Sequence, residues 1–142
     1  IAEKCLLLRE MTEHAQRLQV QLCIENLSEQ PEDFAPAFDA CPSLGLTLDI
    51  GHGQLLTERN TAFAFAQRCP GRIKHVHAHD NRGGTTPKDD LHLPIGAGCI
   101  DFAALLNCLK RSGYDGTITL EIDPGELAAG SAICADIWEK AL

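Results

Sequence analysis

Short apolar runs alternate with longer amphipathic stretches along this chain. Four of the runs have the length and composition of buried β-strands, and each ends in a side chain of a type that binds metal ions: Gln21–Glu25, Leu44–Asp49, Ile73–His77 and Thr117–Glu121. Strands rich in valine, isoleucine and leucine that alternate with helices favour a parallel sheet buried on both faces. We therefore predict an α/β fold with four parallel strands.

Apolar residues at helical spacing predict that helices connect these strands. The predicted helices span about residues 2–18, 31–41, 58–68 and 102–111, and a last helix runs to Leu142. Asp101 fits the N-cap position of the fourth helix, and Ser112-Gly113 fits its end.

Four parallel strands make either a small open sheet or one half of an eight-stranded barrel. A four-stranded sheet that does not close exposes its two outer strand edges. If it is a half-barrel, it also exposes the apolar inner face of the sheet. The connection from Asn81 to Ile100 is longer than usual and rich in glycine and proline, which indicates a functional segment. We favour a single half-barrel domain over residues 1–142, incomplete relative to a whole barrel, and the start at Ile1 without methionine fits a piece of a longer protein.

Composition narrows the range of functions. The chain has 142 residues, 44% of them hydrophobic and 23% charged, and no apolar run long enough to cross a bilayer. A formal charge of −8 opposes contact with nucleic acid and with anionic membrane surfaces. The seven cysteines are scattered and form no CxxC pair, so we interpret them as reduced thiols of a cytoplasmic protein rather than zinc ligands.

The ends of the four strands carry the candidate chemistry. Functional side chains gather at the carboxyl ends of parallel strands, so Glu25, Asp49, His77 and Glu121 are expected to converge. Three carboxylates and an imidazole would repel without a cation, which predicts a divalent metal site suited to Mn, Mg or Zn. For any one of these residues alone, a helix cap or an ion pair is an equally good interpretation.

Further polar residues follow the second and third strands. Asp90 and His92 lie on the same side of an extended segment, so both can reach one ion or one group of hydroxyls. His75, His77 and His79 share one parity, and periodicity does not separate them. The neighbouring glycines at 96 and 98 fit tight backbone turns better than a phosphate-binding role.

Five motifs follow one another along the chain: Ile24-Glu25-Asn26, Asp49-Ile-Gly-His52, His75-Val-His77-Ala-His79-Asp80-Asn81, Asp90-Leu-His92-Leu-Pro-Ile-Gly96-Ala-Gly98 and Gly113-Tyr-Asp-Gly116-Thr-Ile-Thr-Leu-Glu121. In this order they resemble the xylose isomerase-like TIM-barrel superfamily. The superfamily includes sugar-phosphate isomerases and epimerases, ketose 3-epimerases and endonuclease IV. The resemblance covers nearly the whole chain but only the second half of that fold, strands five to eight.

The resemblance implies roles for individual residues. Glu25, Asp49, His77 and Glu121 match the metal ligands, and the family motif selects His77 among the three histidines. His52 matches a substrate contact in the epimerases. In endonuclease IV it matches, together with Asp90 and His92, a ligand of another metal ion. Arg82 is either a substrate contact or a solvated loop residue.

The function that this resemblance implies is metal-dependent isomerisation or epimerisation of a sugar or sugar phosphate in carbohydrate metabolism. Glu25 and Glu121 would act as base and acid on a carbon next to a carbonyl, through an enediolate. The alternatives are an endonuclease IV-like phosphodiesterase and a noncatalytic barrel fragment. We expect either a homo-oligomer or association with a missing amino-terminal half.

Overall fold

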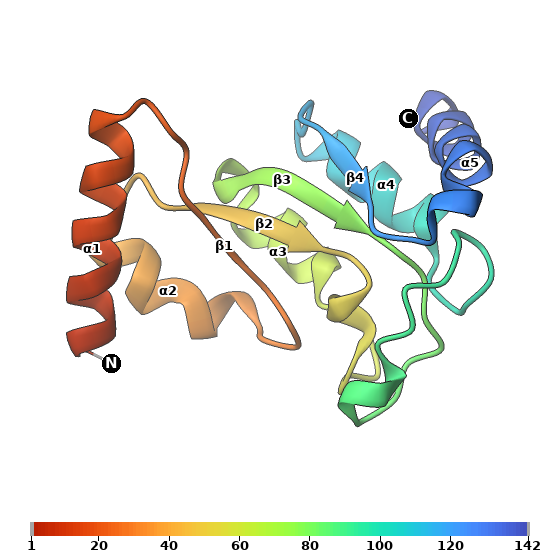
Figure 1. Cartoon of the computed structure of the whole chain (residues 1–142), viewed down its shortest axis with the longest axis horizontal. Coiled ribbons are helices and arrows are strands. Elements are labelled where there is room, and N and C mark those ends of the chain that lie inside the picture. The colour runs from red at the N-terminus through yellow and green to blue at the C-terminus, as the bar shows by residue number, and fades with distance from the viewer. Residues whose placement is uncertain (1, 142) are drawn as a thin grey trace.

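A computed structural model describes residues 2–141 and contains a single sheet flanked by helices (Figure 1). The elements in chain order are α1 (Ala2–Arg17), β1 (Cys23–Glu25), α2 (Pro31–Ala40), β2 (Gly45–Asp49), η1 (His52–Gln54), α3 (Ala62–Arg68), η2 (Pro70–Arg72), β3 (Ile73–Ala78), η3 (Pro87–Asp89), α4 (Phe102–Arg111), β4 (Ile118–Leu120), η4 (Pro124–Glu126) and α5 (Leu127–Lys140). Each strand is followed by at least one helix, which is the pattern predicted from the sequence.

The four strands form one parallel sheet in the order β1-β2-β3-β4. Neighbouring strands follow one another along the chain, so every connection has to cross over a face of the sheet through a helix. The predicted α/β fold with four parallel strands is confirmed. The register pairs Asp49 with His77, and His77 with Thr119, which brings the ends of the strands to a common edge.

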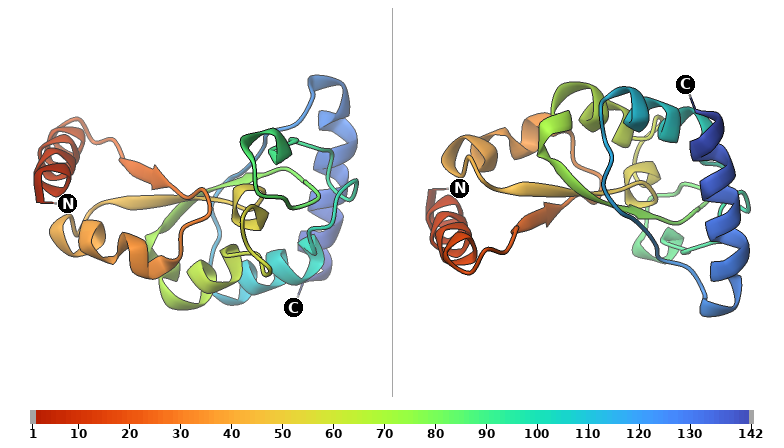
Figure 2. Two further views of the ribbon diagram at one scale, coloured as in Figure 1. Left: turned by 90° about the horizontal axis from the view of Figure 1, so that it is seen from below. Right: turned by 90° about the horizontal axis from the view of Figure 1, so that it is seen from above.

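The two faces of the sheet differ in character. Leu46, Leu48 and Val76 are fully buried on one face, in a core shared with side chains such as Phe65 of α3 and Leu105 of α4. The helices α2, α3 and α4 lie together on this side of the strands (Figure 2). Burial of this aliphatic surface is the main contribution to the stability of the fold.

The opposite face is polar, and the prediction of strands buried on both faces with an apolar inner face was wrong. Alternate residues point to opposite faces, so Thr47, His75, His77 and Thr119 lie together on the second face. His75 Nε2 on β3 lies 2.8 Å from Thr119 Oγ1 on the neighbouring strand β4, and this contact is open to solvent. The aliphatic residues of the four runs fall on the helix side, which leaves hydroxyls and imidazoles on the other.

The helix boundaries agree with the sequence at most positions. Asp101 accepts a hydrogen bond from the backbone N–H of Ala104, so the predicted N-cap of α4 is confirmed. Helix α3 begins four residues later than predicted, because Asn60 is buried in the preceding turn, where its side chain bonds Ile50 O and the N–H of Ala62. The predicted end of the last helix, at residue 142, lies outside the described residues.

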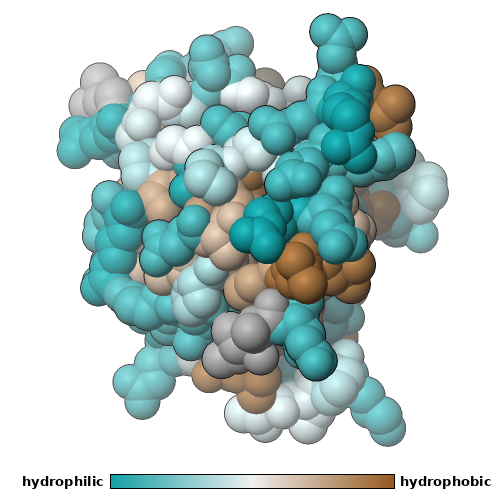
Figure 3. All heavy atoms as spheres, turned by 90° about the vertical axis from the view of Figure 1, so that its left-hand side faces the viewer, coloured by the Kyte–Doolittle hydropathy of each residue, from teal (hydrophilic) through white to brown (hydrophobic). Residues whose placement is uncertain are grey.

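Helix α1 lies at the β1 edge of the molecule and contacts α2 (Figure 1). Three apolar side chains of α1 and one that directly follows it are about half exposed: Leu6, Leu7, Met11 and Leu18. The surface on this side is mainly hydrophilic, with apolar side chains in small separate groups (Figure 3). No helix among residues 2–141 is both long enough and apolar enough to cross a membrane.

The long connection after β3 is fixed by one buried carboxylate. Asp80 is fully buried and accepts hydrogen bonds from the backbone N–H groups of Gly96, Gly98 and Ile100. A Cβ at Gly98 would lie 2.1 Å from Asn81 O, so only glycine permits this close approach. The glycines therefore serve the backbone of the loop, and the bridge between Asp80 and Leu93 fixes the segment that carries Asp90 and His92.

Candidate active site

The carboxyl ends of the four strands bring three carboxylates to one imidazole. His77 Nδ1 lies 2.9 Å from Glu25 Oε1, 3.0 Å from Glu121 Oε1 and 3.8 Å from Asp49 Oδ2. Glu25 ends β1 and Glu121 follows β4, so these two side chains approach His77 from the two edges of the sheet. The four residues predicted to converge are thus brought together by the fold.

Asp49 is the most constrained of these side chains. It is fully buried, and its Oδ1 accepts a hydrogen bond of 2.7 Å from the backbone N–H of His52. Burial is the largest single influence and raises the pKa of Asp49, but contacts with His79 and with His52 outweigh it and hold the pKa below its ordinary value. The carboxylate therefore remains charged in a buried position.

The second oxygen of Asp49 has no hydrogen-bond partner among the described residues. A buried, charged oxygen without a partner is costly unless a cation or water approaches it. Ligand atoms of Asp49, His77 and Glu121 lie within 4.8 Å of one another, and those of Glu25, Asp49 and His52 form a second such group. Carboxylate oxygens with one or two imidazoles suit Mg, Mn or Zn, so this donor set fits a divalent cation.

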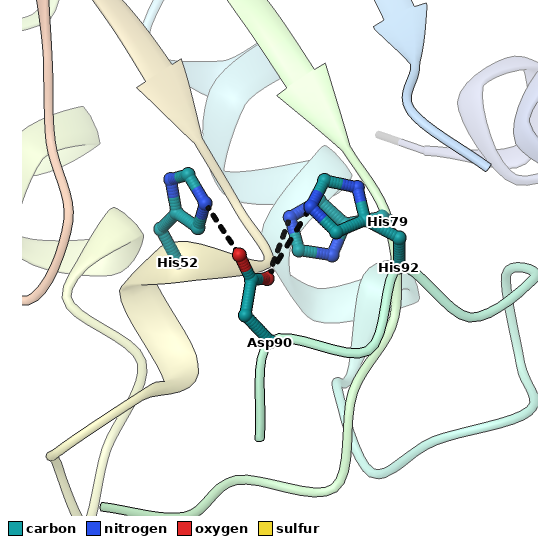
Figure 4. Close-up of side chains that lie close together, drawn as sticks. All are labelled: His52, His79, Asp90 and His92. Atoms are coloured by element: carbon teal, nitrogen blue, oxygen red, sulfur yellow. Dashed lines mark hydrogen bonds and ion pairs between the residues drawn. The ribbon is translucent and has the colours of Figure 1, made fainter. Parts of the chain in front are cut away.

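A second polar cluster adjoins the first and contains His52, His79, Asp90 and His92 (Figure 4). Asp90 lies between the histidines: Oδ2 is 3.3 Å from His52 Nε2, and Oδ1 is 3.4 Å from His92 Nε2. Oδ1 is buried and has no hydrogen-bond partner among the described residues. His92 Nδ1 also contacts the backbone oxygen of Glu121 at 2.7 Å, which links the two clusters.

His79 was not selected as a site residue from the sequence. It is fully buried, 3.2 Å from Asp49 Oδ1, and its ring stacks on that of His92 at a centroid distance of 3.8 Å. Burial acts first and lowers the pKa of His79, but Asp49, Asp90 and Glu121 together raise it above its ordinary value. The parity that it shares with His77 was the available signal, but parity alone does not show which imidazole is buried.

The remaining candidates lie outside these clusters. His75 points from the middle of β3 toward Thr119, and Arg82 is an exposed loop residue without a hydrogen bond or ion pair to other described residues. All seven cysteines are free, and none belongs to a group of metal-binding side chains in the described part of the chain.

A small cavity borders the second cluster. Its volume is about 240 Å³, and its lining includes Leu27, Leu55, Leu56 and Pro87 beside His52 and Asp90. The polar cluster thus has an apolar wall on one side.

Residues 7–135 match the model of the family described as xylose isomerase-like TIM barrel. The match covers most of the chain, and the chain belongs to this family. An uncharacterised protein of Methanocaldococcus jannaschii is 44% identical over 79 residues, which are 56% of this chain and 26% of the relative. The resemblance stated from the five motifs is confirmed.

Solved structures agree with this assignment. A D-tagatose 3-epimerase-like protein is 33% identical, with a TM-score of 0.81 over 95% of this chain and 53% of the other. The IOLI protein, solved with a zinc atom bound, is 19% identical, with a TM-score of 0.77 over 97% of this chain and 56% of the other. The chain thus spans about half the length of these proteins, and its four strands correspond to half of a TIM barrel.

Proposed function

We propose that this chain supplies the carboxyl-terminal half of the active site of a metal-dependent isomerase or epimerase of sugars or sugar phosphates. The observation that carries the proposal is the placement of Glu25 and Glu121 on either side of His77, at 2.9 and 3.0 Å. Its domain is a half-barrel over residues 1–142, which acts in a complete barrel made with another copy or another segment. The 33% identity to a D-tagatose 3-epimerase-like protein supports this class of reaction.

Glu25 and Glu121 are proposed to act as general base and general acid. Glu25 ends β1 and Glu121 directly follows β4, and these are the two outer strands of the sheet, so the two carboxylates approach a substrate held over His77 from opposite sides. One carboxylate takes a proton from the carbon next to the carbonyl, and the other returns a proton to the enediolate. Return to the opposite face of the same carbon gives epimerisation, whereas return to the neighbouring carbon gives isomerisation.

Asp49 and His77, together with Glu25 and Glu121, are the proposed metal ligands. When bound, a divalent cation would polarise the carbonyl and the adjacent hydroxyl of the sugar. The unpartnered Oδ2 of Asp49 supports this assignment, as does the zinc atom in the related IOLI structure. Manganese, magnesium and zinc all suit the donor set.

The second cluster is proposed to contact the substrate. Asp90 accepts hydrogen bonds from sugar hydroxyls, and His52 and His92 bind hydroxyl groups from either side of it. Arg82, on the exposed loop after β3, is the proposed contact for a more distant oxygen or phosphate.

A phosphodiesterase of the endonuclease IV type is the second candidate. His52, Asp90 and His92 lie close enough to hold a second cation, and that arrangement favours it. The formal charge of −8 disfavours a nucleic-acid backbone. The number of ions bound distinguishes the two, since one ion per site supports the sugar enzyme and two or more support the nuclease.

The test combines metal analysis with a panel of keto- and aldo-sugars on the intact chain in the assembly that it forms. His77→Ala should remove stoichiometric metal and any turnover. The matched control is His75→Ala, two residues earlier on the same strand, which should keep both. Full metal occupancy in His77→Ala would show that the ligand assignment is wrong.

A further inference from the structure

His79 is a polar side chain in a position that packing alone does not explain. It is 0% exposed, and neither of its ring nitrogens has a partner in hydrogen-bond geometry among the described residues. An imidazole buried in this way loses its contacts with water, which costs free energy. A leucine or phenylalanine would fill the same space without this cost, so the imidazole calls for a functional explanation.

The surrounding backbone is shaped to this ring. A Cβ at Gly51 would lie 2.1 to 2.3 Å from the Cε1, Nδ1 and Nε2 atoms of His79. The φ of Gly51 is −67°, so the residue is glycine because of this close approach and not because of a left-handed conformation. The carbonyl of Gly51 accepts a hydrogen bond of 2.6 Å from the Asn81 side chain, which holds the backbone against the ring.

The His79 ring belongs to the second polar cluster and also lies against Asp49 of the first. Nε2 lies 3.2 Å from Asp49 Oδ1 and 3.8 Å from Asp90 Oδ1. The face of the ring stacks on His92 with an angle of 12° between the planes, and the ring of His52 lies nearly perpendicular to it, with the two ring centroids 5.4 Å apart. In Figure 4 the overlapping rings of His79 and His92 stand on the same side of Asp90.

We propose that His79 is a positioning residue that sets the orientation of the Asp49 carboxylate and of the His92 ring. Oδ1 of Asp49 accepts a hydrogen bond from the N–H of His52 and lies 3.2 Å from His79 Nε2, an ion-pair contact outside hydrogen-bond geometry. With Oδ1 placed in this way, the unpartnered Oδ2 faces His52 Nδ1 at 3.5 Å and His77 Nδ1 at 3.8 Å. The stacked ring of His79 limits the rotation of His92. The inference rests on the proposed function, in which Asp49 binds a metal ion and His92 contacts the substrate.

Two substitutions distinguish the effect of the His79 Nε2 atom from the effect of the size of the ring. His79→Phe keeps a planar ring against Gly51 and His92 but removes Nε2, whereas His79→Gln keeps an N–H donor at a similar reach. His75→Phe is the control for a histidine on the same strand. The probe is Co²⁺, titrated into the intact wild-type and variant chains, with affinity and the visible absorption bands as the readouts.

We expect His79→Phe to weaken Co²⁺ binding about 10- to 100-fold, which is the usual effect of losing a group that orients a metal ligand. Its visible bands should also shift, while the stoichiometry stays at one ion per site. His79→Gln should recover most of the affinity, and His75→Phe should match wild type. Wild-type affinity and spectrum in His79→Phe would overturn the inference, and so would the loss of a whole ion, which would make His79 a ligand.

A measurement without metal keeps this inference separate from the proposed function. The backbone N–H of His52 bonds Oδ1 of Asp49, so its NMR resonance reports the carboxylate orientation. The resonance should shift in the metal-free His79→Phe chain and stay in place in His75→Phe. If wild type binds no Co²⁺, the proposed function fails, while an unshifted His52 resonance overturns the positioning role itself.

Discussion

Asn26 and Asp49 are joined by two hydrogen bonds between a side chain and a backbone. Asn26 Nδ2 donates to Asp49 O, and Asp49 N donates to Asn26 Oδ1, both at 2.9 Å. Asn26 follows directly after β1, so its amide extends the pairing of β1 with β2 by one step. The link fixes the backbone of Asp49 at the point where its carboxylate enters the site.

Replacing Asn26 with Ala should destabilise the fold and disturb the site together. Both backbone groups of Asp49 would then be buried without a partner, at a cost of roughly 1–3 kcal/mol each. Urea denaturation should show a lower midpoint with an unchanged slope. Asn107→Ala is the control, because Asn107 Oδ1 has no hydrogen-bond partner among the described residues. The free energy of unfolding of this variant should stay within about 0.5 kcal/mol of wild type.

Substitution of Asp90 with Asn or of His92 with Gln should weaken sugar turnover but leave the principal metal ion in place. Neither residue belongs to the group of Asp49, His77 and Glu121, so that donor set stays intact. Elemental analysis of the purified variants gives the number of ions. Loss of a distinct second ion would move the assignment toward the phosphodiesterase.

The single tyrosine of the chain should titrate at unusually high pH. Tyr114 is 8% exposed and donates a hydrogen bond of 2.6 Å to Thr117 O. Burial, followed by the charges of Asp115 and Cys23, raises the pKa of Tyr114 to about 12. Absorbance at the tyrosinate band of the folded protein should therefore show a midpoint near this value, and a midpoint at the ordinary value of about 10 would contradict the burial.

The same shift predicts a loss of stability in alkali. The folded chain holds the phenol proton of Tyr114 more tightly than the unfolded chain, which stabilises the folded state at any pH below the unfolded pKa of about 10. This stabilisation is lost as the pH rises from about 10 to about 12. The loss should amount to roughly 2–3 kcal/mol, at 1.36 kcal/mol per unit. Tyr114→Phe should lack this part of the pH dependence when unfolding is followed by urea denaturation.

Self-association is expected at low micromolar concentration. The outer edges of β1 and β4 have no strand partner among the described residues, and α1 exposes several apolar side chains. Unpaired edges favour pairing with another chain, and two four-stranded halves would make eight strands. Light scattering should report a species larger than a monomer, whereas a compact monomer that binds no hydrophobic dye would contradict the prediction.

The sequence by itself determined the order of the elements and the residues at the strand ends. The apolar runs have the length and β-branched composition of buried strands, and each run is followed by a helical pattern, so a parallel sheet follows from local physics. Once the sheet is parallel, its carboxyl ends meet, and Glu25, Asp49, His77 and Glu121 have to lie near one another. The N-cap of α4 at Asp101 is also a local feature, because it depends only on this side chain and on the first turn of the helix.

The tertiary structure alone decided that His79 is buried beside the site and which face of the sheet is polar. His75, His77 and His79 have one parity, so parity could not show that His79 is buried. The packing of Gly51 against the His79 ring made that difference, while His75 lies beside Thr119 in a position open to solvent. The links of Asn26 to Asp49 and of Asp80 to Gly98 span 23 and 18 positions of the chain. Such contacts depend on how distant segments pack, and no local pattern in the sequence encodes them.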